Sequence, residues 1–359
     1  MGSTRIEFHS CLPEIAGEWL RLEQGCANPS IQNNYLVLNA WYACYLADRT
    51  PAFLSLWQED TCLGIYPFTL EKKYGARVFN TLYHESFSIS KPVVQDGQEE
   101  FFFMELVRLL PEQHGKWDVI KLSSIYCFDT EARLLTSAFA RNNMKVFTIH
   151  DRTYAIEIED SFEKYRLTYL SKKTRENLDR LEKKIAKKDN RLVYYQNSEA
   201  LPHMRRFYEM ENTGWKKDTG TALINMNDNL VYTESLIHNC CLAGKFLMTF
   251  LELDGVKIAG QFGYIENGVY NGLRTAYDRE YSMFGPSIIL IARTLRLLID
   301  TFPDVKLMNC YPLSYGYKQK YAHDRCECNT HVLFSDSIKG KLMSVAYKYK
   351  MSKRQPPQP

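Results

Sequence analysis

The sequence predicts an α/β (α+β) protein with two tandem domains, each a mixed, mainly antiparallel sheet flanked by helices. The chain has 359 residues, which is long for one hydrophobic core. Helix-type and strand-type periodicities alternate in both halves. We place the N-terminal domain at residues 1–155, the C-terminal domain at 156–345, and a disordered, basic and Pro-rich tail at 346–359.

The first half contains a hairpin and a crossover. Residues 51–57 and 63–70 have strand character and flank a polar turn, as in a β-hairpin. Residues 99–110 repeat apolar side chains at helical spacing, and residues 117–122 then read as a strand. A helix followed by a strand implies a crossover connection. Residues 146–158 form the last predicted strand of this half.

The second half contains a three-strand meander. Strands are predicted at residues 246–253, 256–265 and 269–276, separated by Asp254-Gly255 and Asn267-Gly268. Such dipeptides accept positive φ and are strong hairpin signals. Helices are predicted at 204–211, 230–243 and 286–301, and a strand at 305–311. Pro286 occupies a favoured first helical position.

Composition indicates a folded protein of the cytoplasm. Hydrophobic residues make up 45% of the chain, and no apolar run is long enough to span a bilayer or to serve as a signal peptide. Peripheral membrane contact is left open. Ten cysteines lie mostly far apart, so we expect reduced thiols.

Two clusters of polar residues are candidate ligand sites. His323, Cys326, Cys328 and His331 offer zinc-type ligands, but strand alternation sends the histidines and the cysteines to opposite faces, so we expect no metal. A basic helix at about residues 172–188 has an apolar stripe at Leu178, Leu181 and Ile185. Its charges form either a solvated face or a rim that attracts phosphates or another anionic partner. The net charge of +3 does not by itself indicate nucleic-acid binding.

The start of the predicted helix at 286 is a candidate anion site. The first turn of a helix presents N–H groups without helical partners, and these bind phosphates in many proteins. Gly285, Ser287 and Ile288 would donate such N–H groups to a pyrophosphate. Pro286 has no N–H but sets the helical φ.

Several segments in order resemble one family of enzymes. They are FLSLW (53–57), LGIYPF (63–68), WDVIKL (117–122), SKKTR (171–175), WKKDTGTA (215–222), LELDGVKIA (251–259), AYDREY (276–281), SMFGPS (282–287) and YK (317–318). Together they resemble the GNAT superfamily of acyltransferases, in the branch related to the cellulose-biosynthesis protein CelD, and more distantly the FemAB peptidoglycan aminoacyltransferases. The resemblance covers about residues 50 to 335. Two departures are the inverted order Gly285-Pro286, where the family usually has Ser-Pro-Gly, and Asn309 in place of an Asp.

The resemblance implies two GNAT-like domains and an N-acyltransferase. The C-terminal domain would bind acyl-CoA, and the N-terminal domain, without a cofactor, would help to form the acceptor site. The acyl group would pass to the amine of an amino sugar, small metabolite or peptide by direct attack on the thioester. One alternative is FemAB-like transfer from aminoacyl-tRNA, and a nucleic-acid partner is expected only under this alternative. Another alternative is an inactive GNAT-fold binding protein.

The candidate site residues fall into three groups. Asp278 is the first choice for base or acceptor anchor and Glu211 the reserve, although either fits a salt-bridged structural carboxylate; Tyr317 would protonate the leaving thiolate or pack in the core. The candidate acyl-CoA contacts are Ala276, Tyr277, Tyr281, Phe284, Gly285, Ser287, Ile288 and Lys318. The candidate acceptor-side residues are Trp215, Lys216, Gln261 and Asn309, which also fit ordinary core and surface positions.

Overall fold

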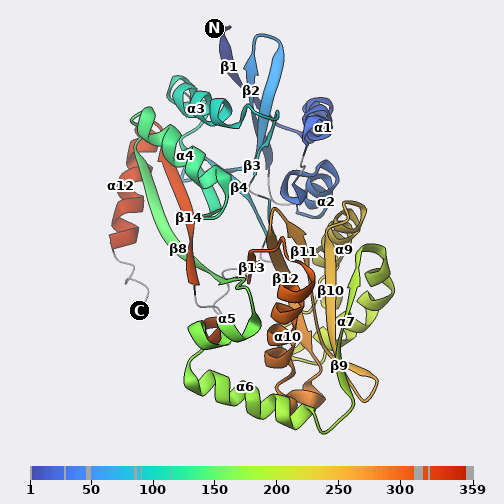
Figure 1. Ribbon diagram of the computed structural model, residues 1–359. Coiled ribbons are helices and arrows are strands. Elements are labelled where there is room, and N and C mark those ends of the chain that lie inside the picture. The colour runs from blue at the N-terminus through green and yellow to red at the C-terminus, as the bar shows by residue number, and fades with distance from the viewer. Residues whose placement is uncertain are drawn as a thin grey trace. The chain divides into compact units, whose positions relative to one another are not determined.

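The chain forms two compact units. A computed structural model describes residues 2–27, 30–45, 50–84, 87–89, 91–113, 115–310, 318–321 and 324–352 (Figure 1). The first unit comprises Met1–Asp151 and Glu327–Pro359, and the second comprises Arg152–Cys326. The division at 151 lies close to the predicted boundary at 155, but residues 327–345 belong to the first unit rather than to the predicted C-terminal domain.

The sheet of the first unit has the strand order β1-β2-β3-β4-β7-β14-β8. The strands are β1 (Thr4–His9), β2 (Thr50–Gln58), β3 (Thr61–Lys73), β4 (Ala76–His84), β7 (Val119–Tyr126), β14 (Asp324–Phe334) and β8 (Val146–Glu157). Short strands β5 (Phe87–Ile89) and β6 (Val93–Val94) pair with β4 and β3. The β2–β3 hairpin is confirmed. The predicted crossover is also confirmed, because β4 and β7 are parallel and a helix lies between them in sequence.

The helices of the first unit are α1 (Ala16–Gly25), α2 (Tyr35–Tyr45), α3 (Glu99–Leu109), α4 (Thr130–Arg141) and α12 (Ile338–Ser352). The last of these corrects the prediction of a disordered tail from residue 346, because residues 346–352 are helical. Met343 and Tyr347 pack against buried Val78, Val119 and Val332, so burial of one face holds this helix in place.

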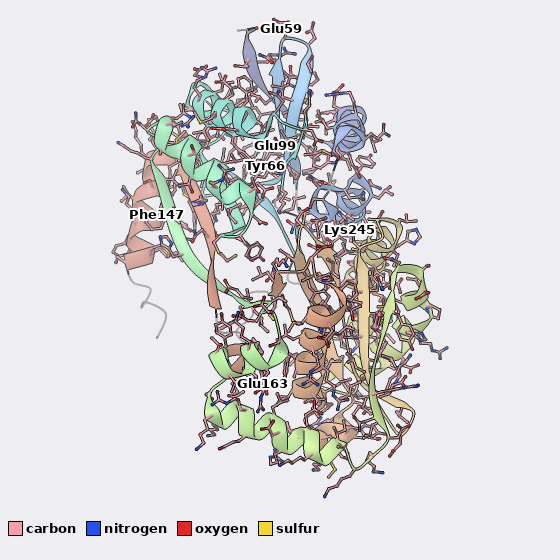
Figure 2. All side chains as sticks on the ribbon, viewed as in Figure 1. Glu59, Tyr66, Glu99, Phe147, Glu163 and Lys245 are labelled. Carbon is pink, nitrogen blue, oxygen red and sulfur yellow. The ribbon has the colours of Figure 1, made fainter. Side chains whose placement is uncertain are left out.

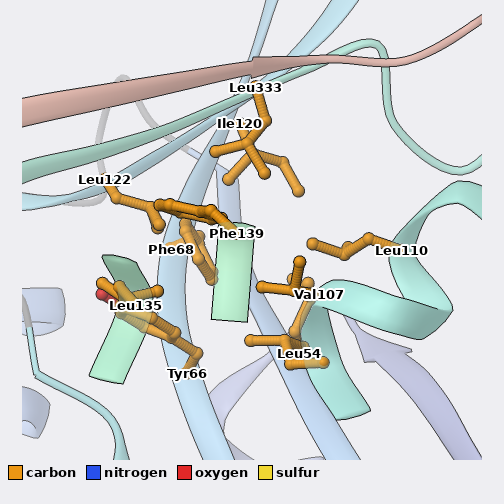
Figure 3. Close-up of a pocket in the computed structure, with 11 residues that line it drawn as sticks. Leu54, Tyr66, Phe68, Val107, Leu110, Ile120, Leu122, Leu135, Phe139 and Leu333 are labelled. Atoms are coloured by element: carbon orange, nitrogen blue, oxygen red, sulfur yellow. The ribbon is translucent and has the colours of Figure 1, made fainter. Parts of the chain in front are cut away.

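The core between this sheet and α3 and α4 contains a small cavity (Figure 3). Leu54, Phe68, Val107, Leu135 and Phe139 are among the eleven residues that line it, and Tyr66 is the single lining residue with a polar side-chain atom. Its volume of about 10 Å³ is room for a water molecule at most. The cavity is therefore part of the packed core and is too small for an acyl chain.

The sheet of the second unit runs from the end of β8 through β13, β12, β11 and β10 to β9. Its further strands are β13 (Leu307–Asn309), β12 (Val269–Tyr277), β11 (Val256–Glu266), β10 (Phe246–Leu253) and β9 (Asn190–Gln196). All neighbours are antiparallel except β12 and β13, which are parallel. The predicted meander is confirmed, and both residues of each turn, Asp254-Gly255 and Asn267-Gly268, have positive φ.

Helices cover both faces of this sheet. They are α5 (Phe162–Tyr169), α6 (Lys172–Ile185), α7 (Met204–Glu211), α8 (Trp215–Asp218), α9 (Asn227–Leu242), α10 (Pro286–Thr301) and α11 (Lys318–Tyr321). Phe207 of α7 packs on Phe262 on one face, whereas Thr294 of α10 hydrogen-bonds Thr249 on the other. Helix α10 has the predicted bounds. Strand β13 is shorter than the predicted 305–311.

No helix among the described residues has both the length and the apolar character needed to cross a membrane.

Candidate functional site

The candidate site of the second unit lies along one edge of β12. Strand β13 pairs with β12 only from Val269 to Asn271, and the next residue, Cys310, donates its N–H to Tyr154 of β8. Beyond Asn271, β12 has no ladder partner on this side among the described residues. The Asp278 N–H donates to Ile258 of β11. Because main-chain groups alternate in direction, those of Thr275 and Tyr277 point toward the open edge.

Two buried amide side chains lie near the point where β12 and β13 separate. The Asn309 Nδ2 donates to the Asn271 Oδ1 at 3.2 Å, across the last paired rung. The Gln261 Nε2 lies 3.5 Å from the Tyr270 hydroxyl. Of these two predicted acceptor-side residues, Asn309 thus lies where β12 and β13 separate. Gln261 has a polar partner inside the core, which matches the alternative that it occupies an ordinary core position.

A buried ionic cluster stands beside the open edge. The Glu211 carboxylate ends α7 with its side chain fully buried, and its Oε1 accepts from the Lys216 Nζ at 2.5 Å and the Arg274 Nη1 at 2.8 Å. Its Oε2 accepts from the Leu223 N–H at 2.8 Å. The Lys216 Nζ also donates to the Thr275 carbonyl at 3.2 Å. The structure therefore brings Glu211 and Lys216 together, and adds Arg274, which the sequence analysis missed.

Burial and charge oppose each other in this cluster. Burial disfavours ionisation of Glu211, but Lys216, Arg274 and the Leu223 N–H outweigh it and hold the pKa of Glu211 below its ordinary value. Burial lowers the pKa of Lys216, with Glu211 acting in the opposite direction. A carboxylate with a lowered pKa and three donors is a weak proton acceptor. With all three groups ionised, the cluster carries a net charge of +1.

Asp278 follows β12 and is held in an ion pair. Its Oδ2 accepts from the Arg206 Nη2 at 2.9 Å, and its Oδ1 accepts from the Glu280 N–H at 3.3 Å. The latter contact caps the 3₁₀ helix η7 (Arg279–Phe284). Of the two roles that the sequence left open for Asp278, this geometry matches the salt-bridged structural carboxylate.

The start of α10 follows η7 directly. Gly285 adopts the left-handed conformation (φ 62°, ψ 46°). Its N–H donates to Ser282, and the Ile288 N–H donates to Gly285, both at 3.0 Å. Two of the three predicted phosphate donors are therefore engaged within the turn, whereas the Ser287 N–H has no partner among the described residues.

Helix α6 brings a cation to this turn. The Lys184 Nζ donates to the Met283 carbonyl at 2.9 Å and lies 5.2 Å from the centre of the Phe284 ring. Leu181, one helical turn earlier, packs against Gly285. In the sequence, Lys184 is one of the basic residues of the predicted helix at about 172–188, and only the packing of α6 against α10 brings it to this turn.

The remaining predicted residues are placed as follows. Ala276 and Tyr277 end β12, and Tyr277, Tyr281, Phe284 and Ile288 pack around one apolar cluster beneath α6 and α10. Tyr317 lies outside the described residues. The backbones of Trp215 and Lys318 begin α8 and α11, and their side chains are not described. Within the described ranges, no three His, Cys, Asp or Glu side chains gather as metal ligands.

Comparison with known families matches most of this unit to one kind of domain. Residues 172–319 match the family model described as acetyltransferase (GNAT) domain. Over these residues the second unit is similar to a GNAT domain. This match confirms the predicted fold and the prediction of an enzyme of the transferase class. A search of curated protein sequences gave no match.

Solved structures show the same fold at low sequence identity. A conserved protein of unknown function from Bacteroides thetaiotaomicron VPI-5482 is 12% identical, with a TM-score of 0.52 over 92% of this chain and 100% of that one. The C-terminal domain of a putative lysylphosphatidylglycerol synthetase from Agrobacterium fabrum is 10% identical, with a TM-score of 0.51 over 92% and 96%. FemX is 9% identical, with a TM-score of 0.51 over 94% and 99%. At such identities the similarity concerns the fold alone.

Proposed function

We propose that the GNAT domain transfers an acyl group from acyl-CoA to an amine at the open edge of β12. The observation that carries the proposal is a buried cluster, Glu211–Lys216–Arg274, beside the edge of β12 that has no strand partner beyond Asn271 among the described residues. The amine would belong to an amino sugar, a small metabolite or a peptide. The CelD-like branch and a cytoplasmic location belong to the same proposal.

The donor would use two features of this unit. The pantetheine arm of coenzyme A contains amide groups, which suit the Thr275 N–H and the main-chain groups of Tyr277 as an added strand would. The pyrophosphate would meet the Ser287 N–H, the positive end of the α10 dipole and the Lys184 ammonium. Because Gly285 and Ile288 use their N–H groups internally, Lys184 replaces them in our assignment of phosphate contacts.

The chemistry follows from where charge develops. The neutral amine nitrogen attacks the thioester carbonyl carbon, and the π electrons move to the carbonyl oxygen. Collapse of this intermediate breaks the C–S bond and releases the thiolate, and the nitrogen, now bonded to the acyl carbon, loses its extra proton to water. The positive charges of Lys216 and Arg274 would stabilise the oxyanion in a buried environment. Glu211 would hold these cations in place, Asp278 would position η7, and Tyr317 remains the proposed proton donor to the thiolate.

Replacement of Lys216 tests this assignment. Lys216→Met should lower kcat/KM by about 100-fold, the usual effect of losing one oxyanion-stabilising group. Lys216→Arg, which keeps the charge, should retain part of the activity, and Lys217→Met provides the matched control on the same short helix, because Lys217 is exposed. Release of free CoA with a panel of amines is the measurement. Equal turnover by Lys216→Met and Lys217→Met would remove Lys216 from the site.

A second candidate function is FemAB-like transfer from aminoacyl-tRNA. Helix α6 buries Leu178, Leu181 and Ile185 and exposes a basic face that includes Lys173 and Lys183, and the exposed Lys187 follows two residues after the helix ends. An exposed row of cations suits the phosphate backbone of a nucleic acid. The similarity in fold to FemX adds to this alternative.

The two donors predict different footprints on α6. If acyl-CoA is the donor, Lys184→Met weakens acetyl-CoA binding in calorimetry, and the triple variant Lys173→Met/Lys183→Met/Lys187→Met binds as wild type does. If tRNA is the donor, the triple variant lowers the slope of log affinity against log salt by about 2 to 3, because each phosphate contact contributes about 0.7 to 0.9. A chain that binds neither donor and turns over no thioester would instead support the inactive GNAT-fold binding protein.

A further inference from the structure

Helix α12 of the first unit has an exposed apolar stripe opposite its packed face. On the packed face, the ring of Tyr347 meets that of Phe147 in β8 at 5.4 Å between centroids. Figure 1 shows α12 beside β8, and Figure 2 labels Phe147. With about 100° of rotation per residue, four large apolar residues fall on the other side in a single narrow row. They are Ile338, Leu342, Val345 and Tyr349, with exposed fractions of 80%, 65%, 67% and 62%.

Lysines flank this stripe on both sides. At the same rotation per residue, Lys341 and Lys348 lie on one side of the row, and Lys339 and Lys350 on the other. All four are exposed, and the Lys339 Nζ also donates to the Gly75 carbonyl oxygen at 2.8 Å. Residues 338–352 contain no Asp or Glu, and Lys353 and Arg354 follow in sequence. The outer half of α12 is therefore an apolar row between two positive borders.

We propose that α12 is a peripheral membrane anchor that lies in the headgroup layer of an anionic bilayer. The stripe would enter the boundary between headgroups and acyl chains, as the apolar face of interfacial helices does. The flanking lysines would extend to the lipid phosphates, because their long apolar stems let the ammonium groups reach the interface. Each basic residue near an anionic surface strengthens binding by about fivefold.

The charges of α12 disfavour the other partner that such a stripe suggests, a second copy of this chain. Pairing two α12 stripes would place lysine borders against lysine borders, with no acidic residue on either helix to neutralise them. An anionic lipid surface supplies the missing negative charge along both borders. This inference is independent of the proposed acyl transfer, because α12 belongs to the first unit and the GNAT domain to the second.

Vesicle binding by the full chain tests the proposal. The probes are phosphatidylcholine vesicles with and without phosphatidylglycerol, with sedimented protein as the measurement. Wild type should bind the phosphatidylglycerol vesicles, lose binding as NaCl is raised, and bind pure phosphatidylcholine at least about tenfold less. Leu342→Gln/Val345→Gln should reduce binding at least about tenfold through lost apolar burial. Lys341→Gln/Lys348→Gln should reduce it about 25-fold.

Matched controls separate this stripe from any exposed apolar or basic residue. Leu242→Gln, at a leucine of α9 that is 68% exposed, and Lys72→Gln/Lys116→Gln, at exposed lysines of the first unit, should bind as wild type does. Failure of wild type to bind vesicles, or equal binding by all variants, overturns the proposal. If wild type self-associates in sedimentation equilibrium, Leu342→Gln/Val345→Gln abolishes this self-association, and no vesicle binding occurs, the proposal is overturned in favour of a second copy. The proposal is also overturned if the substitutions in α12 abolish only the binding of an acidic protein.

Discussion

The Glu211 cluster predicts an asymmetry between two substitutions that remove the same ion pair. Glu211→Gln removes the buried carboxylate that accepts from both Lys216 and Arg274, whereas Lys216→Met leaves Glu211 paired with Arg274 and the Leu223 N–H. Removing one partner of a buried ion pair costs about 3–5 kcal/mol. Losing one hydrogen bond to a group that stays neutralised costs about 1.5–3 kcal/mol. We therefore expect Glu211→Gln to destabilise the second unit about twice as much as Lys216→Met.

The assay must report the second unit separately from the first. Urea unfolding followed by pulsed hydrogen exchange gives this resolution, with peptides from β12 and α10 as reporters for the second unit and peptides from β2 and β3 as the internal reference. The reference peptides should unfold at the same urea concentration in all variants. If Lys216→Met destabilises the β12 peptides as much as Glu211→Gln does, net charge does not govern the cluster, and our account of it is wrong.

Two further predictions concern local geometry and pH. Gly285→Ala should destabilise the second unit by about 2–5 kcal/mol in thermal unfolding, because the new Cβ would lie 2.7 Å from Leu181 and the backbone is left-handed. The control Gly244→Ala, with φ 70° and open space around it, should cost only about 1–2 kcal/mol, and equal costs would contradict the predicted clash. Burial, with His150 nearby, lowers the pKa of His331 from 6.5, so on acidification the unfolded chain binds a proton at this residue before the folded chain does, and the stability of the first unit falls as pH drops below about 6.5. His331→Gln should flatten the dependence of stability on pH measured by denaturation at several pH values, and an unchanged dependence would contradict the prediction.

The sequence predicted those elements whose signals are local. The meander follows from Asp254-Gly255 and Asn267-Gly268, since each pair accepts the positive φ of a tight turn. Helix α10 has its predicted bounds because Pro286 sets the first turn and the apolar period continues to Thr301. Both signals depend on neighbours in the chain, so they are visible before any tertiary contact is known.

The parts that were missed depend on distant contacts. The strand character of the β14 segment is visible in the sequence, but its pairing with β7, far away in sequence, is not; α12 then packs on the same unit through Met343 and Tyr347. In the sequence, the α12 segment resembles a polar tail, because it contains more lysines than residues that pack on the first unit. Similarly, Arg274 joins Glu211 from 63 residues away, so no spacing rule could have indicated it.

A single β-bulge connects the fold of the second unit to its ionic cluster. Phe262 of β11 pairs with Arg274 and Gly263 pairs with Gly272, so Leu273 is an extra residue in β12. Without it, Arg274 would stand opposite Gln261, on the face that α10 covers, and would point away from Glu211. A side-chain carbon at Gly263 would lie 2.1 Å from the Asn271 carbonyl oxygen, which rules out any other residue there without a shift of the main chain. Gly263 permits the bulge, and the bulge turns Arg274 toward α7. The positive charge at the open edge therefore depends on Gly263, which is itself uncharged.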